Sequence, residues 1–548
     1  MPRVPDFDEL IASPSRIAPA PPRRVAVGSR PRIDEWWGRM LRTPRRRRAW
    51  LWCGPAAVTL LAAVLRLWDL GRPGTLVFDE TYYVKDAFSM LRLGYEGQWP
   101  AEADARFVAG DVDIFTATGE YVAHPPLGKW IIALGLQVFG AEDPVGWRIS
   151  TAVIGVLAVA LVCAVAFALF RSALLATIAG GLLATDGLAI AMSRTALLDG
   201  PLQLLTLLGV GAVLLDRKQS AEDLAAWTAR RRAADRTTDW GPALWDRPWL
   251  LTAGLFFGFA SAVKWSGLYF LAAFAVYVLL ADAMARRRAG VAFWFSSVVF
   301  RQAPVNFLLM VPIAVIAYVT SWTGWLLTDG GWGRDWADQE AARLGEAPLP
   351  WVVAAARSLW HYQVTMYNSN VGLSTPHNYQ ANPLTWLLMT DPTVFLRAST
   401  PSGEDGCRYS VCADVVTTLA NPLLWWLSVA ALGVAVWLFA GKRNWQAGLL
   451  LTGVAAGYLP WLLYLDRTVF QFYTLVFLPY LVLAFTAVLG LVLGSRDDPP
   501  ERRRSGILLV AVLLSLIVLL AAFEYPLATG TRVPEWFQRL HYWMPGWV

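Results

Sequence analysis

Charged side chains are scarce in this sequence. Only 16% of the 548 residues are Asp, Glu, Lys or Arg, whereas 56% are hydrophobic and 29 are tryptophan. The mean hydropathy is correspondingly positive, at +0.43. Soluble domains carry roughly 25% charged residues, so the composition excludes a soluble enzyme and predicts an all-α polytopic membrane protein.

Histidine and cysteine are also scarce, with four of each. The histidines at 124, 361, 377 and 541 are scattered, and neither HxxxH nor CxxC spacing occurs. Metal sites in proteins usually show such clustered ligands. We therefore expect no metal and no cofactor, although the acidic loop residues leave room for a divalent ion.

Eleven apolar stretches are read as membrane-crossing helices, which need about 20 residues. They are 50–67, 148–170, 173–192, 196–215, 249–263, 265–282, 303–325, 421–440, 446–464, 470–494 and 507–523. No small-residue cleavage pattern follows the first stretch, so we interpret it as a retained signal anchor. Residues 1–48, rich in Pro, Arg and Ala, are predicted to form a disordered basic cytoplasmic tail.

The distribution of Lys and Arg predicts the orientation, because these residues collect on the cytoplasmic side. With a cytoplasmic N-terminus, the segments on that side carry 29 of the 47 Lys and Arg residues. The other side receives loop 68–147, with 12 acids against 5 bases, and loop 326–420, with 9 against 5. We expect a plasma-membrane protein whose pI of about 9.1 reflects topology and not nucleic-acid binding.

This topology divides the chain into modules. The tail is followed by a transmembrane module, 49–325, which includes the first loop; the second loop separates it from a C-terminal module, 421–548. Cys407 and Cys412 lie in the second loop, where an oxidising environment would favour a disulfide between them. Two free thiols are the alternative.

Two adjacent acids, Asp79 and Glu80, open the first loop in the string VFDETYYVKDAF. Helix capping by Asp79 and a favourable dipole contact of Glu80 would explain them without any chemistry. The same loop continues to AHPPLGKWIIALG, where His124 and Lys129 precede a short apolar segment. We expect this segment to lie along the interface as an amphipathic helix, with Lys129 either snorkelling or binding substrate.

Five cations fall at the outer ends of spans, where the charge rule does not expect them. They are Arg66, Arg148, Arg194, Lys264 and Arg467. Each alone is explained as a snorkelling anchor, but together they predict a ring that binds an anionic lipid headgroup. Sugar transfer from a lipid phosphate needs a base, which Asp79 could supply, and cations that stabilise the departing phosphate.

Several strings resemble one known family. RLWDLGRPGTLVFDETYY, AHPPLGKWIIALG and GWRISTAVIGVL are similar to segments of the protein O-mannosyltransferases, and the similarity runs through most of residues 60–490. The resemblance implies a GT-C glycosyltransferase fold with polyprenyl-phosphate mannose as donor. It also implies Ser or Thr hydroxyls of proteins on the extracytoplasmic face as acceptors, and inversion at the anomeric carbon.

The resemblance also assigns residues. Asp79 takes the position of the family's catalytic acid, Glu80 that of its second acid and Arg148 that of its essential arginine. The expected contacts to lipid phosphate or acceptor are His124, Lys129, Arg194, Lys264, His377, Tyr379 and Arg467.

The chain departs from the family pattern in its second loop. STPHNYQANPLTW has Ala381 where the family's His-x-Tyr-x-Ser string has serine. The loop also lacks the long soluble insert of eukaryotic members, which favours a bacterial type, and the composition suggests an actinobacterial one.

Two other functions compete with this interpretation. A GT-C transferase that moves another lipid-linked sugar onto a glycolipid would use the same acid pair, but the HPPLGK and GWR strings argue against it. A transporter is disfavoured because the charges lie at one surface and no halves repeat. Whether the enzyme works alone, as a dimer or beside the Sec translocation machinery stays open.

Overall fold

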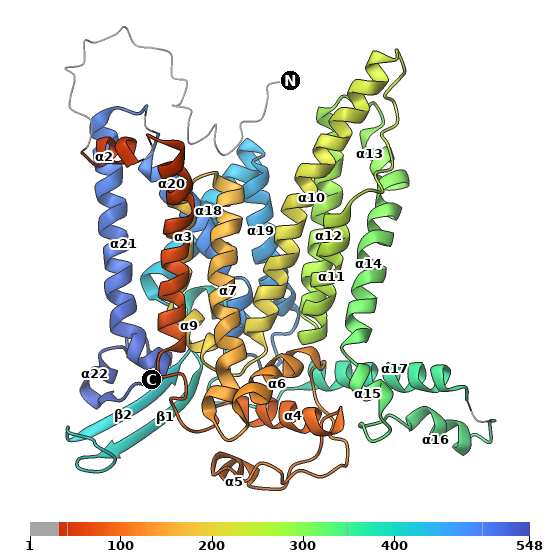
Figure 1. Cartoon of the computed structure of the whole chain (residues 1–548), viewed down its shortest axis with the longest axis vertical. Helices are drawn as coiled ribbons and strands as arrows, with labels where there is room; N and C mark the ends of the chain where they lie inside the picture. Colours follow the sequence, from red (N-terminus) through yellow and green to blue (C-terminus); the bar gives the residue numbers. More distant parts are fainter. Residues whose placement is uncertain (1–31, 41, 348, 496, 548) are drawn as a thin grey trace.

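A computed structural model describes residues 32–547, with the exception of 41, 348 and 496. Figure 1 shows long, roughly parallel helices that form a bundle, with short helices and a small sheet gathered at one end. We call this the loop end and the opposite end, where α2 (Arg32–Met40) lies, the basic end.

Each of the eleven predicted spans coincides with helical structure. The bundle helices are α3 (Pro44–Leu67), α7 (Pro144–Phe170), α8 (Ala173–Thr185), α9 (Gly187–Ser193), α10 (Asp199–Ala233), α11 (Pro248–Val263), α12 (Gly267–Arg288), α14 (Ala303–Thr320), α18 (Pro422–Lys442), α19 (Trp445–Tyr458), α20 (Leu478–Leu493) and α21 (Pro500–Thr529). Among the described residues, eight helices are long and apolar enough to cross a membrane, or nine if α8 and α9, bent by 64°, form one span. The helical membrane architecture is confirmed, while the number eleven stays a prediction.

The two long loops contain secondary structure of their own. The first holds α4 (Glu80–Leu93), α5 (Ala103–Val108) and α6 (Leu127–Phe139), and the second holds α16 (Trp336–Arg343) and α17 (Trp351–Gly372), while α15 (Thr323–Leu327) straddles its start. Both loops lie at the loop end (Figure 1), as the charge pattern predicted. The expected short helix after HPPLGK is α6.

A three-stranded antiparallel sheet at the loop end was not predicted. It comprises β1 (Val394–Pro401), β2 (Val411–Thr417) and β3 (Val533–Pro534), which precedes α22 (Glu535–Arg539). The sequence signal was weak because β1 has three consecutive exposed residues and no clear alternation. The fold remains mostly helical, with this sheet as a small addition.

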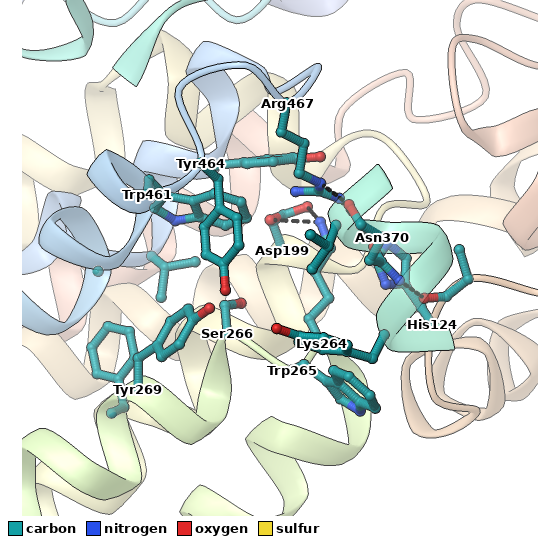
Figure 2. A pocket seen from close by; sticks show the side chains of 17 residues that line it. His124, Asp199, Lys264, Trp265, Ser266, Tyr269, Asn370, Trp461, Tyr464 and Arg467 are labelled. Atoms are coloured by element: carbon teal, nitrogen blue, oxygen red, sulfur yellow. Dashed lines mark hydrogen bonds and ion pairs between the residues drawn. The ribbon is translucent and has the colours of Figure 1, made fainter. Parts of the chain in front are cut away.

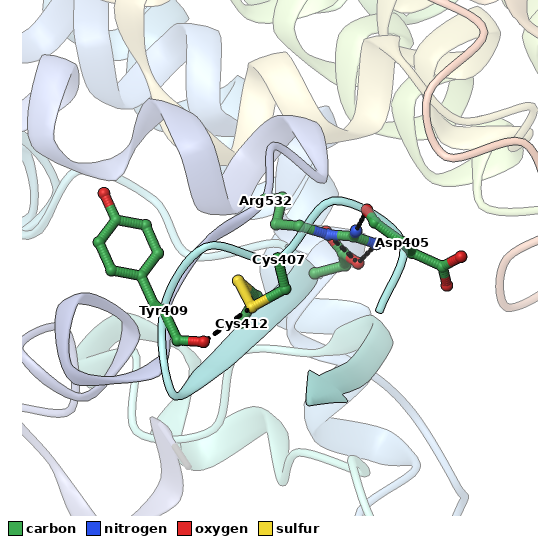
Figure 3. Close-up of a disulfide and its surroundings, with 6 residues drawn as sticks. Asp405, Cys407, Tyr409, Cys412 and Arg532 are labelled. Atoms are coloured by element: carbon green, nitrogen blue, oxygen red, sulfur yellow. Dashed lines mark hydrogen bonds and ion pairs between the residues drawn. A yellow bond between two sulfur atoms is a disulfide. The ribbon is translucent and has the colours of Figure 1, made fainter. Parts of the chain in front are cut away.

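The expected disulfide between Cys407 and Cys412 is formed in the structure and closes the β1–β2 hairpin (Figure 3). Arg532 joins the hairpin to the segment that follows α21, with Nη2 lying 2.6 Å from the Asp414 carboxylate. The second loop and the C-terminal segment are thus held together.

The predicted disordered tail is wrong in part. Residues 1–31 lie outside the described part of the chain, but α2 is helical and α3 already begins at Pro44. The side chain of Thr43 caps α3, and proline is well suited to the first helical position. Arg503 in α21 forms an ion pair with Asp34 at 3.1 Å and ties α2 to the bundle.

Candidate active site

A cleft with a cavity volume of about 100 Å³ lies at the loop end. Its walls come from α10, the α11–α12 turn, α17 and the segment between α19 and α20. Figure 2 shows His124 and Asn370 on one side of the central pair of Asp199 and Lys264, and Trp461 and Tyr464 on the other. Three predicted residues distant in sequence, His124, Lys264 and Arg467, therefore meet in one place.

Lys264 occupies the turn between α11 and α12. Its Nζ donates to both oxygens of the Asp199 carboxylate, at 3.1 and 2.9 Å, and lies 4.5 Å from the centre of the Tyr473 ring. Asp199 stands in the first turn of α10, so the ion pair fixes the start of this helix against the α11–α12 turn. The ammonium group is thereby held in the cleft wall.

Arg467 is held by Asn370 of α17. Its Nε donates to the backbone carbonyl at 2.5 Å and its Nη2 to the side-chain oxygen at 3.0 Å, while the guanidinium lies 5.5 Å from the centre of the Trp461 ring. Nη1 makes no hydrogen bond within the described residues. Arg467 is thus positioned with one donor group left for an anionic ligand.

Asp79 lies at the N-cap position of α4, but its side chain makes no capping hydrogen bond, so the capping alternative fails. The Tyr83 side chain, one turn along α4, neighbours this carboxylate. Burial raises the pKa of Asp79 to about 6, the positive charge of Lys264 opposes this shift, and the negative charge of Asp199 adds to it. The carboxylate is therefore more basic than an ordinary aspartate. Asp79 is not among the cleft-lining residues but lies beside them, since the preceding Phe78 contacts Phe472 at 5.6 Å between ring centres and Lys264 Nζ lies 5.9 Å from the Phe472 ring.

Glu80 and Arg148 form a fully buried pair behind Asp79. Arg148 donates through Nε and Nη2 to the two carboxylate oxygens at 2.8 and 2.7 Å. It also donates to the carbonyl oxygens of Pro73 and Thr75 at 2.7 and 2.8 Å. The pair fixes the segment that carries Asp79 onto α7.

Comparison with known proteins identifies the family. A model of the dolichyl-phosphate-mannose-protein mannosyltransferases matches residues 56–328, and a model of the C-terminal four-helix membrane region of protein O-mannosyltransferases matches residues 355–547. A relative named polyprenol-phosphate-mannose–protein mannosyltransferase from Mycolicibacterium smegmatis is 34% identical over 509 residues, which are 91% of this chain and 93% of the relative.

The chain belongs to the protein mannosyltransferase family.

Further comparisons agree with this assignment. A relative of the same name from Mycobacterium tuberculosis is 34% identical over 92% of both chains, and one from Corynebacterium glutamicum is 28% identical over 90% of this chain and 92% of its own. The solved Saccharomyces cerevisiae protein O-mannosyltransferase complex bound to the sugar donor matches with a TM-score of 0.66 at 14% identity, covering 90% of this chain and 92% of that one. The GT-C fold and the glycosyltransferase class are confirmed.

The predicted ring of cations is wrong for this mannosyltransferase, because three members are buried and engaged elsewhere. Arg66 donates to the last carbonyls of α8, and Arg194 donates to the carbonyl of Arg66 in the last turn of α3 and to those of Trp68 and Asp69 just after it, at 2.7–3.2 Å. Arg148 is engaged by Glu80. Arg66 and Arg194 thus satisfy backbone oxygens at and just after helix ends, and because all three arginines are buried within the protein, none of them snorkels.

Lys129 is neither a snorkelling anchor nor a cleft residue. It is 1% exposed, lies 2.5 Å from Glu96 and 4.0 Å from Asp86, and donates to the carbonyl of His124 at 3.3 Å. It therefore holds the fold of the first loop and supports the His124 backbone. Burial, followed by the charges of Lys264, Lys129 and Arg467, lowers the pKa of His124 well below its ordinary value, which makes a neutral imidazole.

His377 and Tyr379 do not line the cleft but lie near the acid motif. The His377 ring contacts Phe78, the residue before Asp79, at 5.8 Å between ring centres, and its Nδ1 accepts from the backbone N–H of Tyr379. Ala381 is buried and donates from its backbone to Val469. The segment therefore packs against the acid motif without the family serine.

Sequence reasoning missed three residues of the site: Tyr83, Asp199 and Tyr473. Asp199 stands in the string SRTALLDGPL, and an acid beside an apolar run is a sequence signal that could have identified it as a functional residue. The two tyrosines carried no such signal, because aromatic residues are common throughout the chain. Among the described residues, no group of three or more His, Cys, Asp or Glu side chains is arranged to hold a metal ion.

Proposed function

We propose that this chain transfers mannose from polyprenyl-phosphate mannose to Ser or Thr hydroxyls of proteins, at the membrane face that carries the loop end, with inversion. The observation that supports it is the placement of one basic carboxylate, Asp79, against a cleft that presents Lys264 and Arg467. The names of the curated relatives supply the donor and the acceptor class.

Residues at the site can perform each chemical step of this transfer. The Asp79 carboxylate takes the proton of the acceptor hydroxyl as its oxygen bonds to the anomeric carbon. The bond from that carbon to the phosphate oxygen breaks, and the lipid phosphate leaves with the electron pair. Lys264 and Arg467 stabilise the negative charge that the phosphate gains.

The number of carboxylates that are free to react at the site favours inversion. A retaining double displacement needs a second carboxylate free to attack the sugar. Glu80 is engaged by Arg148, and Asp199 is engaged by Lys264. Of these three described carboxylates, only Asp79 has no ion-pair partner, and a single base supports a single, inverting displacement.

The acceptor class is tested by incubating the purified enzyme with radiolabelled polyprenyl-phosphate mannose and a Ser/Thr-rich peptide. We expect label on the peptide that alkaline β-elimination releases. Label recovered only in a glycolipid would overturn the protein acceptor in favour of the lipid-directed alternative.

Arg467→Ala should lower kcat by about 10² to 10³, because it removes a positioned charge from the departing phosphate. The loss should persist at saturating donor, since the contact strengthens as charge develops. Arg343→Ala, on the exposed face of α16, is the matched control and should leave kcat unchanged. A rise in donor KM at constant kcat would instead make Arg467 a docking residue.

Orientation is tested with single cysteines in a Cys53→Ser background. We expect Asp111→Cys and Asp338→Cys, both at exposed loop-end positions, to react with a membrane-impermeant thiol reagent outside intact cells. Thr237→Cys, exposed at the basic end, should stay unlabelled. The reverse pattern would place the cleft in the cytoplasm. An extracytoplasmic cleft would meet chains as they are exported, so the proposal includes proximity to the Sec machinery.

A further inference from the structure

A second cavity is lined by residues of α10 and α12 that approach the basic end. Figure 1 shows this part of the two helices at the opposite end of the bundle from the loop end. Its volume is about 390 Å³, within the usual range of ligand pockets. The mannosyl transfer described above uses none of its residues.

Four arginines and two aspartates line this cavity. Arg247 lies between both aspartates, with Nη2 2.5 Å from Asp216 and Nη1 2.7 Å from Asp282, so these three groups compensate one another. The other arginines are Arg217, Arg232 and Arg288. The lining therefore carries a net positive charge, which suits an anionic ligand.

The position of the charges along the helices indicates a lipid. Apolar side chains such as Val213 and Val278 line the cavity nearer the middle of the two helices, beside the ion-paired Asp216, Arg247 and Asp282. Arg232 stands about five turns beyond Val213 along α10, and Arg288 stands about three turns beyond Val278 along α12. Arg232 and Arg288 thus lie toward the basic-end termini of α10 and α12, beyond the apolar and ion-paired part of the lining. Basic pockets between transmembrane helices bind anionic lipid headgroups.

A buried hydroxyl without a partner points to the same conclusion. Tyr277 of α12 lines the cavity, and its Oη is buried without a hydrogen-bond partner among the described residues. Leaving such a group unpaired is unfavourable. A phosphate or glycerol oxygen in the cavity would satisfy it.

We propose that this cavity binds an anionic membrane phospholipid, with Arg232 and Arg288 contacting the phosphate and Tyr277, about three turns before Arg288 on α12, contacting an ester oxygen where the acyl chains begin. The arginines supply charge-assisted hydrogen bonds, and the apolar wall receives the upper part of the acyl chains. Such a lipid would fill the space between α10 and α12 and join them near the basic end. The site is separate from donor binding and does not depend on the proposed function.

The test uses the full-length purified protein titrated with phosphatidylglycerol, and separately with phosphatidylcholine, followed by native mass spectrometry. We expect one phosphatidylglycerol to bind more tightly than phosphatidylcholine. The Arg232→Glu/Arg288→Glu variant should weaken that binding by about tenfold or more. Arg236→Glu/Arg287→Glu makes the same charge change nearby without touching the cavity lining and should bind as the wild type does.

Three outcomes would overturn the proposal: equal affinity for the two lipids, equal loss in both double variants, or displacement of phosphatidylglycerol by millimolar inorganic phosphate, which would indicate a site for free phosphate. Tyr277→Phe preserves the shape of the cavity and should weaken phosphatidylglycerol binding by about threefold or more. Should the first double variant fail to fold, Tyr277→Phe and the comparison of the two lipids decide the question.

Discussion

Replacing Asp79 with asparagine should leave the enzyme folded and reduce mannosyl transfer by about 10² to 10⁴, the usual contribution of a general base. Asparagine keeps the size of the side chain, but it cannot take the hydroxyl proton. The measurement is the initial rate of peptide labelling at saturating donor, with a thermal melt to confirm folding.

Asp104→Asn in α5 is the control for the asparagine substitution, because this acid is half exposed and lies outside the cleft lining. It should keep near-normal activity. Full activity of Asp79→Asn would remove Asp79 from the mechanism and require another base.

The rate of the wild-type enzyme as a function of pH should follow the ionisation of Asp79, since Asp79 acts only when ionised. Its pKa is raised to about 6, so the rate should be high above that value and should fall by about tenfold per unit below it. This acidic limb should be missing from the residual activity of Asp79→Asn. Persistence of the limb in the variant would assign it to a different group.

Glu80→Ala should destabilise the protein strongly. It leaves the Arg148 guanidinium fully buried without its counter-charge, and breaking a buried pair in this way costs about 3–5 kcal/mol. We expect a lower melting temperature and rapid proteolysis of the first loop. Loss of activity should follow from loss of the folded state.

Glu340→Ala, which breaks an exposed ion pair with Arg343, is the matched control and should leave the melting temperature unchanged. The double change Glu80→Met/Arg148→Met should recover part of the lost stability, because two apolar side chains leave no unpaired charge. Normal melting of Glu80→Ala combined with slow turnover would contradict the structural role and support a catalytic one.

Sequence alone was sufficient for the architecture and for the acid motif. The apolar runs predicted the bundle helices, and the charge bias placed both long loops at one end. Asp79, His124, Lys264 and Arg467 were selected from the acid motif, the HPPLGK string and the unusual position of cations, and all four are at or beside the cleft.

The wrong assignments of charged residues share a physical cause. The sequence shows where a charged residue lies along the chain, but not which groups it contacts in the folded protein. Arg66 and Arg194 are as unusual in sequence position as Arg467, yet they donate to helix-end carbonyls that only the tertiary structure brings near. Glu80 was assigned the position of the family's second acid from the resemblance, but its partner Arg148 is 68 residues away in the sequence. The contact of Tyr473 with Lys264 is also distant in sequence, whereas the β1–β2 hairpin is local and was missed because its strands lack a clear alternation.

The separation of Glu80 from Arg148 also governs the order in which the protein can mature. Synthesis proceeds at about 5–20 residues per second, so Arg148 follows Glu80 by about 3 to 14 s. During this interval the glutamate must stay hydrated, and the segment bearing Asp79 cannot dock. Docking becomes possible only once α7 has entered the membrane and delivered its arginine, so insertion of the second long span is the event that commits the first loop to its final shape.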